Sequence, residues 1–326
     1  MTQMGPADPD SDRLQSPVIL SVVIPAFNEE NGILAFHDRL REAVKPLAVQ
    51  LEALYVDDGS TDGTHEKLTT LQASDPSVGY LRFSRNFGKE TAVTAGLNHA
   101  RGAVVIVIDA DLQDPPELIP EMLDAWKRGA DIVNMRRISR AGETLLKKMT
   151  SHLFYRVMNK LSEVPIPVDV GDFRLLSRRA VDALNRMPER NRFMKGLFAW
   201  IGFRQETLPY HREPRAAGNS KWPYWRLWNL AVEGVTGFST APLKLALYFG
   251  LASSLGAFCA LVYFLIKTLL IGDPVPGFPA TIVTVLFLGG VQIASIGILG
   301  EYIARIFIES KGRPLYLVDT YKPAEL

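Results

Sequence analysis

Cysteine is nearly absent from this 326-residue chain, in which Cys259 is the single copy. One thiol cannot form an intramolecular disulfide, and no cysteine cluster or paired histidine offers ligands for zinc. Cys259 lies in an apolar run, so we expect it to pack against other apolar side chains. An excess of one charge is also lacking, because 36 Lys and Arg balance 35 Asp and Glu to a net charge of +1. This balance gives no support for bulk nucleic-acid binding.

The N-terminal segment lacks the basic start and apolar stretch of a secretory signal. Residues 1–16 are polar and include three aspartates, so we expect a disordered tail. The chain also shows no internal repeat.

Apolar residues are concentrated in two runs near the C-terminus. Leu245–Ile266 has 22 residues without a charge, and Pro274–Gly300 has 27. A membrane-spanning helix needs about 20 apolar residues. We therefore expect two spans, at about 243–267 and 275–301, within a membrane segment at 242–306. Basic residues flank the outer ends of this segment: Arg226, Lys244, Arg305, Lys311 and Arg313. Because the connecting loop carries only Lys267, the positive-inside rule places both outer ends in the cytoplasm.

Before these runs, the hydrophobic pattern alternates between strands and helices. Strands are predicted at 18–25, 51–56, 78–83, 103–108 and 131–134, and helices at 33–44, 63–71, 90–99 and 118–127. This β-α-β-α order predicts an α/β fold with a mostly parallel sheet and helices on both faces.

The pattern changes after residue 145. Helices are predicted at 145–161 and 179–187, and strands at 173–176 and 204–209. Residues 222–235 contain three tryptophans and are of mixed polarity, which is typical of an interfacial helix lying on a membrane.

Acidic clusters follow three of the predicted strands. They are PAFNEE at 25–30, DDGSTDGT at 57–64 and DADLQD at 109–114. Ligands of open α/β sheets bind beyond the carboxyl ends of the strands, so we expect these clusters to meet at one edge. One such cluster is commonly a helix cap or a turn. Three clusters of like charge at one edge repel one another unless a cation binds.

The spacing of Asp109 and Asp111 indicates a metal site. Residues two apart in an extended strand end point to the same side, so both carboxylates, with Gln113 extending the set, can face one ion. All-oxygen ligation suits Mg²⁺ or Mn²⁺ rather than zinc. A carboxylate pair of this kind commonly holds its metal together with substrate phosphates.

These motifs resemble those of the inverting family-2 glycosyltransferases. GDFRL at 171–175 and RAAGNSKW at 215–222 are similar to segments of the polyisoprenyl-phosphate glycosyltransferases, which include dolichol-phosphate mannose synthases and bactoprenol glucosyltransferases. The two C-terminal apolar runs resemble the bactoprenol branch, and the resemblance extends over Val18–Arg313. We therefore expect a GT-A-type nucleotide-sugar-binding domain at 17–220. A juxtamembrane amphipathic segment at 221–241, the membrane hairpin and a cytoplasmic tail at 307–326 would follow.

The resemblance implies roles for the residues at the strand ends. The nucleotide sugar would contact Pro25, Phe27, Glu29, Val56, Asp58, Asp109 and Ala110. Glu29 would accept hydrogen bonds from the ribose hydroxyls, and Val56 and Asp58 would flank the base. Asp109 and Asp111 would bind the diphosphate and the metal, with Gln113 completing the metal shell.

The acceptor phosphate is expected to meet basic side chains. Arg137, Arg215 and Lys221 are the candidates, since guanidinium suits bidentate phosphate contact and ammonium acts as a point charge. Alternatively, Arg215 and Lys221 contact only anionic lipid head groups, as juxtamembrane basic residues often do.

Asp172 and Asp111 are the candidate catalytic carboxylates. The resemblance implies that Asp172, within GDFRL, lies near the reacting sugar. A phosphate monoester has a second pKa of about 6 and is largely ionised at pH 7, so its attack needs little proton removal. We therefore expect Asp172 to orient the sugar or to stabilise positive charge at its anomeric carbon. A general-base role and a structural salt bridge with Arg174 are the alternatives.

The expected reaction is inverting transfer of a hexose, glucose from UDP-glucose, to undecaprenyl phosphate at the cytoplasmic membrane face. GDP-mannose and a UDP-linked amino-pentose are alternative donors. We expect a multi-pass inner-membrane protein with its catalytic domain and both termini in the cytoplasm. Small residues in the spans predict a homo-oligomer.

The competing functional classes are a processive synthase, a transferase to a protein or saccharide, a non-catalytic scaffold and a small transporter. Two spans without intramembrane charges weigh against the first and last.

Overall fold

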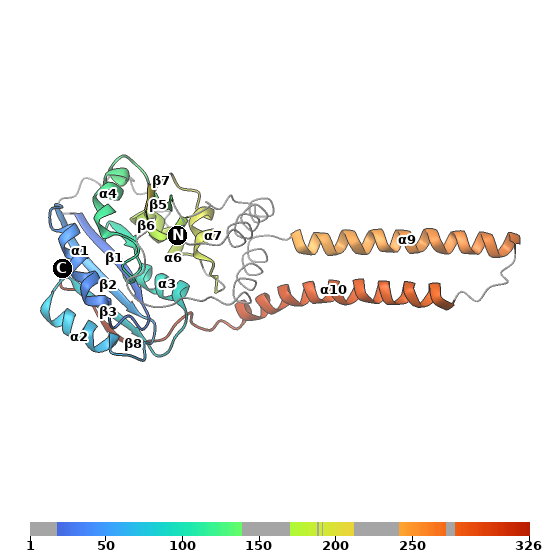
Figure 1. Ribbon diagram of the computed structural model, residues 1–326, viewed down its shortest axis with the longest axis horizontal. Helices are drawn as coiled ribbons and strands as arrows, with labels where there is room; N and C mark the ends of the chain where they lie inside the picture. Colours follow the sequence, from blue (N-terminus) through green and yellow to red (C-terminus); the bar gives the residue numbers. More distant parts are fainter. Residues whose placement is uncertain (1–17, 139–169, 188, 191, 212–240, 272–277) are drawn as a thin grey trace, which may run out of the picture. The chain divides into compact units, whose positions relative to one another are not determined.

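The computed structural model describes residues 18–138, 170–187, 189–190, 192–211, 241–271 and 278–326 (Figure 1). Four predicted features lie outside these ranges: the tail at 1–16, the helix at 145–161, the interfacial helix at 222–235, and the residues Arg215 and Lys221. The described chain forms one α/β unit and one helical hairpin.

A single eight-stranded sheet organises the α/β unit, in the order β7-β5-β6-β4-β1-β2-β3-β8. Its strands are β1 (Val18–Ala26), β2 (Val49–Asp57), β3 (Val78–Phe83), β4 (Val104–Val107), β5 (Ile132–Arg137), β6 (Val170–Ser177), β7 (Gln205–Tyr210) and β8 (Val318–Lys322). The pairs β1–β2, β1–β4, β2–β3 and β5–β7 are parallel. β6 runs antiparallel to both β4 and β5, and β8 runs antiparallel to β3. The mostly parallel sheet is thus confirmed.

Helices cover both faces of this sheet, as predicted (Figure 1). They are α1 (Ile33–Val44), α2 (Thr64–Ser74), α3 (Lys89–His99), the 3₁₀ turn η2 (Pro116–Leu118), α4 (Ile119–Lys127), α6 (Arg178–Asn185) and α7 (Met194–Trp200). One face packs α1, α2 and α4 into a core that includes Phe36, Leu68 and Trp126. On the other face α3 lies so close that a Cβ at Gly96 would stand 2.1 Å from Val23 Cγ1. Glycine at this position therefore allows the helix to reach β1.

Several elements differ from the prediction. β4 ends at Val107, before the expected end, and the chain then enters a turn at 110–111 that is followed by Leu112 with φ +60°. β5 instead continues to Arg137, since its backbone pairs with β6 and β7 along its length. α7 and β8 were not expected. The predicted C-terminal tail at 307–326 contains β8, which pairs with the free edge of β3. The mixed polarity of β8 gives no strand pattern in the sequence.

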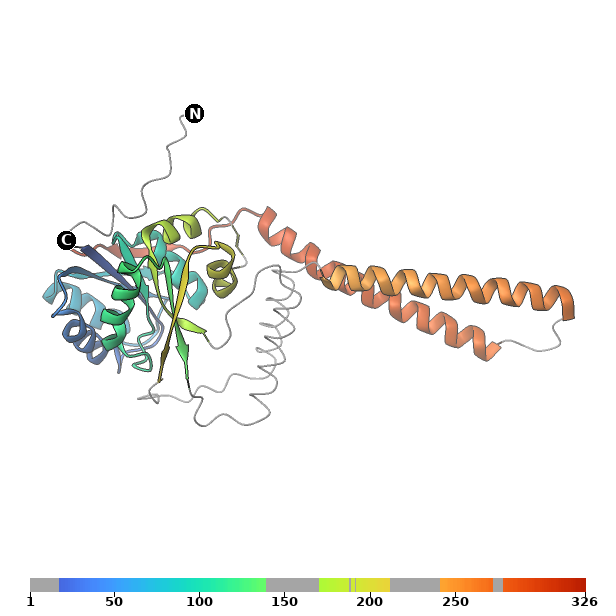
Figure 2. The ribbon, with the colours of Figure 1, turned by 90° about the horizontal axis from the view of Figure 1, so that it is seen from above.

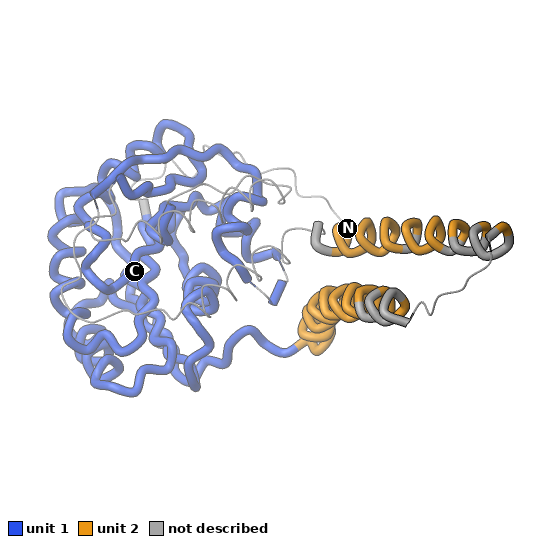
Figure 3. Tube along the Cα trace, turned by 45° about the vertical axis from the view of Figure 1, so that its right-hand side comes forward, with its two compact units in different colours: residues 1–156, 164–224, 313–326 blue, residues 157–163, 225–312 orange. Residues whose placement is uncertain are grey.

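The second unit contains a hairpin of two long apolar helices, coloured orange in Figure 3. α9 (Ala241–Ile271) and α10 (Phe278–Ser310) lie side by side (Figures 1 and 2). Their 31 and 33 residues correspond to about 46 and 50 Å, beyond the ~30 Å of a bilayer core. Both are long and apolar enough to cross a membrane. Cys259, which we expected to be packed, is instead exposed on α9.

Candidate active site

Three loops meet at one edge because β4, β1 and β2 are parallel neighbours. Their carboxyl ends carry the clusters at 25–30, 57–64 and 109–114. The predicted convergence of the acidic clusters is therefore a direct result of strand order, which places β1 between the other two strands.

Reciprocal hydrogen bonds join the loops after β1 and β2. The backbone N–H of Asn28 donates to Ser60 Oγ at 3.0 Å, and the N–H of Thr61 donates back to Asn28 Oδ1 at 2.9 Å. Glu29 N–H likewise donates to Thr64 Oγ1 at 2.9 Å. Asn28 adopts φ +55°, an uncommon conformation that these bonds hold in place. The Ser and Thr residues of DDGSTDGT thus shape the loop and need not contact a ligand.

Asp58 fixes a third segment, the turn that precedes α3. Its carboxylate accepts hydrogen bonds from the backbone N–H groups of Phe87, at 2.7 Å, and Gly88, at 3.0 and 3.2 Å. Next to it, Gly59 has φ +69°, and a Cβ there would lie 2.4 Å from the carbonyl carbon of Arg85. Buried Asp58 therefore holds the start of α3 against the end of β2, whereas its predicted contact with a base stays a prediction.

Asp109 and Asp172 are brought together by the antiparallel pairing of β4 and β6. Val107 lies opposite Arg174 in this pair, and extending the register by two residues sets Asp109 opposite Asp172. The ammonium of Lys89, at the start of α3, binds both carboxylates. Lys89 Nζ lies 2.6 and 2.7 Å from the Asp109 oxygens and 2.6 Å from Asp172 Oδ2. The partner of Asp172 is thus Lys89, which corrects the alternative of a structural salt bridge with Arg174.

These charges shift the titration of the cluster. Burial would raise the pKa of the Asp172 carboxyl, but Lys89 and then Lys195 hold that pKa well below its usual range. Burial raises the pKa of Asp109 in spite of Lys89, because one ammonium cannot neutralise two carboxylates. The neighbouring Glu90 has a pKa raised to about 7 by burial and by the charge of Asp172. Asp172 therefore remains ionised at neutral pH.

Arg137 joins the site from the end of β5. Its guanidinium lies against Gly171, where an added Cβ would stand 2.8 Å from Nη2. Arg137 Nε donates to Tyr210 Oη at 3.3 Å, and this hydroxyl donates to Asp114 Oδ1 at 2.5 Å. Burial opposes the charge of Arg137, but Tyr210 and the nearby Asp114 and Asp172 raise the pKa of its guanidinium. The structure therefore places a fixed cation beside Asp172, where an anionic acceptor can be held.

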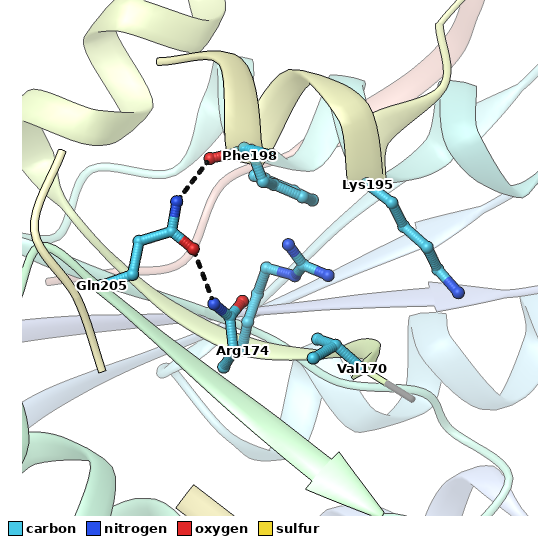
Figure 4. A pocket seen from close by; sticks show the side chains of 7 residues that line it. Val170, Arg174, Lys195, Phe198 and Gln205 are labelled. Atoms are coloured by element: carbon cyan, nitrogen blue, oxygen red, sulfur yellow. Dashed lines mark hydrogen bonds between the residues drawn. The ribbon is translucent and has the colours of Figure 1, made fainter. Parts of the chain in front are cut away.

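A small pocket lies beside β6, and Val170 and Arg174 of this strand line it. Residues two apart in a strand share a face, so Asp172 lies on the same face of β6 as these two residues. Figure 4 shows Lys195 and Phe198 descending from α7 toward them. The Arg174 guanidinium lies 3.8 Å from the centre of the Phe198 ring, and burial lowers its pKa to about 10.

The remaining predicted residues differ in accessibility. Pro25, Val56 and Ala110 are buried, and Val56 has no accessible surface, so in this conformation its side chain supports the site from beneath. Phe27 is exposed and Glu29 is partly exposed, as ligand contacts require. The roles of all these residues toward a nucleotide stay predictions.

Asp109 lies just beyond the end of β4, whereas Asp111 lies in a turn, so the alternation of an extended strand does not reach Asp111. In this turn the Gln113 backbone N–H donates to Asp111 Oδ1 at 3.1 Å. Their shared ligation of a metal, with Gln113, stays a prediction that rests on their position beyond β4.

Sequence reasoning missed Lys89. One signal was available: a lysine at the first position of a helix lies at the positive end of the helix dipole, where a cation is unfavourable. Such a residue needs a compensating anion, and here Asp109 and Asp172 supply two. Lys195 was missed because α7 was not predicted.

The donor set fits a divalent cation shared with a substrate. Within the described ranges, no three Asp, Glu, His or Cys side chains converge to enclose an ion by themselves. Mg²⁺ and Mn²⁺ sites that include substrate phosphates need only one or two protein carboxylates. The space between Asp109 and Asp172 already holds a cation, the Lys89 ammonium. The electrostatics of this edge therefore suit a positive charge.

Comparison with known proteins identifies two families along the chain. The model of glycosyl transferase family 2 matches residues 21–184, and that of the GtrB C-terminal hairpin matches residues 241–306. A bactoprenol glucosyl transferase of Shigella phage SfV is 47% identical over 93% of this chain and 99% of its own. A prophage bactoprenol glucosyl transferase homolog of Escherichia coli is 45% identical over the same shares. Among solved structures, mannosyl-3-phosphoglycerate synthase from Rubrobacter xylanophilus is similar with a TM-score of 0.46 and 18% identity, covering 67% of this chain and 72% of that one. The family-2 model matches half of the chain, and the relatives align over more than nine-tenths of it. The chain therefore belongs to glycosyl transferase family 2 and carries a GtrB C-terminal hairpin.

Proposed function

We propose that this protein transfers glucose, with inversion, from UDP-glucose to a polyisoprenyl phosphate at a membrane surface. The observation that carries the proposal is the meeting of Asp109, Asp172 and Arg137 at one edge of a family-2 sheet. The bactoprenol glucosyl transferases, which align along nearly the whole chain, support the sugar and the acceptor.

The reaction is a single in-line displacement. An oxygen of the acceptor phosphate attacks the anomeric carbon and forms the new bond. The bond from that carbon to the diphosphate oxygen breaks, and its electron pair leaves with the nucleoside diphosphate. Because the phosphate is largely ionised at neutral pH, no proton has to be removed first. Configuration inverts because attack and departure occur on opposite faces.

The chain's own residues place and stabilise the reacting groups. Arg137 holds the acceptor phosphate beside Asp172, and Arg215 and Lys221, outside the described residues, complete this grip. The ionised Asp172 stabilises positive charge that develops at the anomeric carbon. Asp109, Asp111 and Gln113 would hold Mg²⁺ or Mn²⁺, which when bound neutralises charge on the departing diphosphate.

We infer that the hairpin of α9 and α10 anchors the protein in the membrane that contains its lipid acceptor. We place the α/β unit and both chain ends in the cytoplasm, from the basic residues that flank the hairpin. Small residues on the two helices favour association of several copies. A topology reporter inserted between α9 and α10 is expected to lie on the side of the membrane opposite the cytoplasm. A reporter found on the cytoplasmic side would contradict this topology.

The decisive test incubates membranes containing the protein with radiolabelled UDP-glucose, GDP-mannose and a UDP-linked amino-pentose. Label from UDP-glucose is expected to enter the lipid phase, and excess EDTA is expected to abolish its entry. Membranes containing the Asp109→Asn variant serve as the control. Labelling of lipid from another nucleotide sugar alone would correct the donor, and full activity in EDTA would refute the metal site.

A further inference from the structure

Lys89 makes an unusual set of contacts for a residue at the start of a helix. Its ammonium is within 2.7 Å of three carboxylate oxygens, two on Asp109 and one on Asp172. The positive end of the α3 dipole disfavours a cation at this position. The two carboxylates must therefore supply the attraction that keeps the ammonium in place.

The backbone fixes where this side chain starts. Asp58, at the end of β2, accepts the N–H groups of Phe87 and Gly88 and so holds the residue directly before Lys89. Gly88 adopts φ +98°, which turns the chain into α3 at this point. The side chain of Lys89 itself is 43% exposed and is not enclosed by the core. Its head can therefore move while its backbone stays fixed.

The Lys89 ammonium competes with a divalent cation for Asp109. It contacts both carboxylate oxygens, and a divalent cation bound to either oxygen would lie close to the ammonium, where like charges repel. Displacement by free metal leaves the ammonium without one of its two carboxylate partners. When metal arrives with a sugar diphosphate, the diphosphate offers the ammonium new anionic oxygens.

We propose that Lys89 is a positioning residue that holds Asp109 and Asp172 together until the donor binds. It releases Asp109 to a divalent cation only when a nucleoside diphosphate provides the ammonium with a replacement partner. Metal binding is thereby coupled to donor binding, and a cation alone binds weakly. This inference rests on the proposed function, because it assumes that Asp109 is a metal ligand.

The experiment measures binding of Mn²⁺ to the full-length purified protein by electron paramagnetic resonance, with and without UDP. For the wild type, UDP is expected to tighten Mn²⁺ binding by about 5- to 150-fold, the usual range of coupling between two ligands. Lys89→Met is expected to bind Mn²⁺ alone at least about fivefold more tightly than the wild type and to lose most of the coupling to UDP. Lys89→Arg, which keeps the charge, is expected to retain weak binding of Mn²⁺ alone.

Lys195→Met is the matched control. Lys195 contributes charge near Asp172 and Glu90, but it makes no ion pair with Asp109 within the described ranges. An equal gain in Mn²⁺ affinity in this variant would show that net charge alone is responsible and would overturn the proposal. Lys89→Met leaves two largely buried carboxylates without their cation, and removing one partner of a buried ion pair is strongly destabilising. The melting temperature of Lys89→Met is therefore measured first, and Lys89→Gln, whose amide can still donate a hydrogen bond to a carboxylate, is the second variant if Lys89→Met does not fold.

Two different results would separate a wrong metal site from a wrong role of Lys89. If UDP left the Mn²⁺ affinity of the wild type unchanged and Asp109→Asn still bound Mn²⁺, the metal site of the proposed function would be wrong. If Asp109→Asn abolished binding but Lys89→Met bound Mn²⁺ alone no more tightly than the wild type, only the role of Lys89 would be wrong.

Discussion

Replacing Asp172 by asparagine removes one negative charge from the reacting centre and leaves the size of the side chain unchanged. In the structure this carboxylate pairs with Lys89 at 2.6 Å and lies near Arg137 and Lys195. The amide can still accept a hydrogen bond from Lys89, so the local packing is preserved. What changes is the electrostatic potential at the position where the anomeric carbon becomes positive.

The size of the effect follows from Coulomb's law. Two unit charges about 4 Å apart interact by roughly 4 kcal/mol at an effective dielectric constant near 20. Each 1.36 kcal/mol of barrier corresponds to tenfold in rate, so kcat is expected to fall by about 10³-fold. The affinity for the nucleotide should change little, because the charge acts mainly on the transition state.

The assay combines initial rates of label transfer to lipid with calorimetric titration of UDP in the presence of Mn²⁺. Asp182→Asn is the control, since Asp182 forms an exposed ion pair with Arg178 on α6 and should leave kcat unchanged. A kcat for Asp172→Asn within about tenfold of the wild type, with unaltered UDP affinity, would refute a role for this charge in the transition state.

The pH dependence separates charge stabilisation from general-base catalysis. Because Lys89 and Lys195 hold the pKa of Asp172 below its usual range, the carboxylate stays ionised throughout the acidic limb of kcat/KM. That limb should then report the acceptor phosphate, with a pKa of about 6. A general base would instead move the limb when Asp172 is replaced, and such a shift in Asp172→Asn would contradict our assignment.

Three further changes test other parts of the structure. The pKa of Glu90 is raised from 4.5 to about 7 in the folded state, so its contribution to stability is present below pH 4.5 and is lost as the pH rises through 7. Glu90→Gln should therefore match the wild type in free energy of unfolding at pH 4 and exceed it by about 1–3 kcal/mol at pH 8, and a constant difference would contradict the shift. Gly59→Ala should lower the stability by about 1–3 kcal/mol because its Cβ would meet the backbone of Arg85. A melting temperature of Gly59→Ala equal to that of the wild type would refute the clash. Tyr210→Phe removes the hydroxyl that joins Arg137 to Asp114, so it should raise KM for the lipid phosphate severalfold and leave KM for the donor unchanged. A rise in donor KM alone would show that Arg137 serves the nucleotide.

Much of the fold was readable from local pattern. The strand at Val18–Ala26 and the helix at Ile33–Val44 follow the prediction closely, because their apolar periodicity is continuous and decides which face is buried. Similarly, α9 and α10 are recognisable from the length of their apolar runs alone. β8 was not predicted because its residues have no apolar periodicity. Their strand conformation depends on pairing with the backbone of β3.

What the sequence by itself determined is the chemistry available: three acidic clusters placed after strands, basic residues beside them, and two segments that suit a membrane. Only the tertiary structure decided which of these groups meet. Asp109 and Asp172, 63 positions apart, become neighbours because β6 runs antiparallel to β4 in a particular register. Lys89 reaches both because Asp58 holds the start of α3. Local patterns record which face of an element is buried, but contacts between distant residues depend on strand order and register, which arise only when the whole sheet assembles.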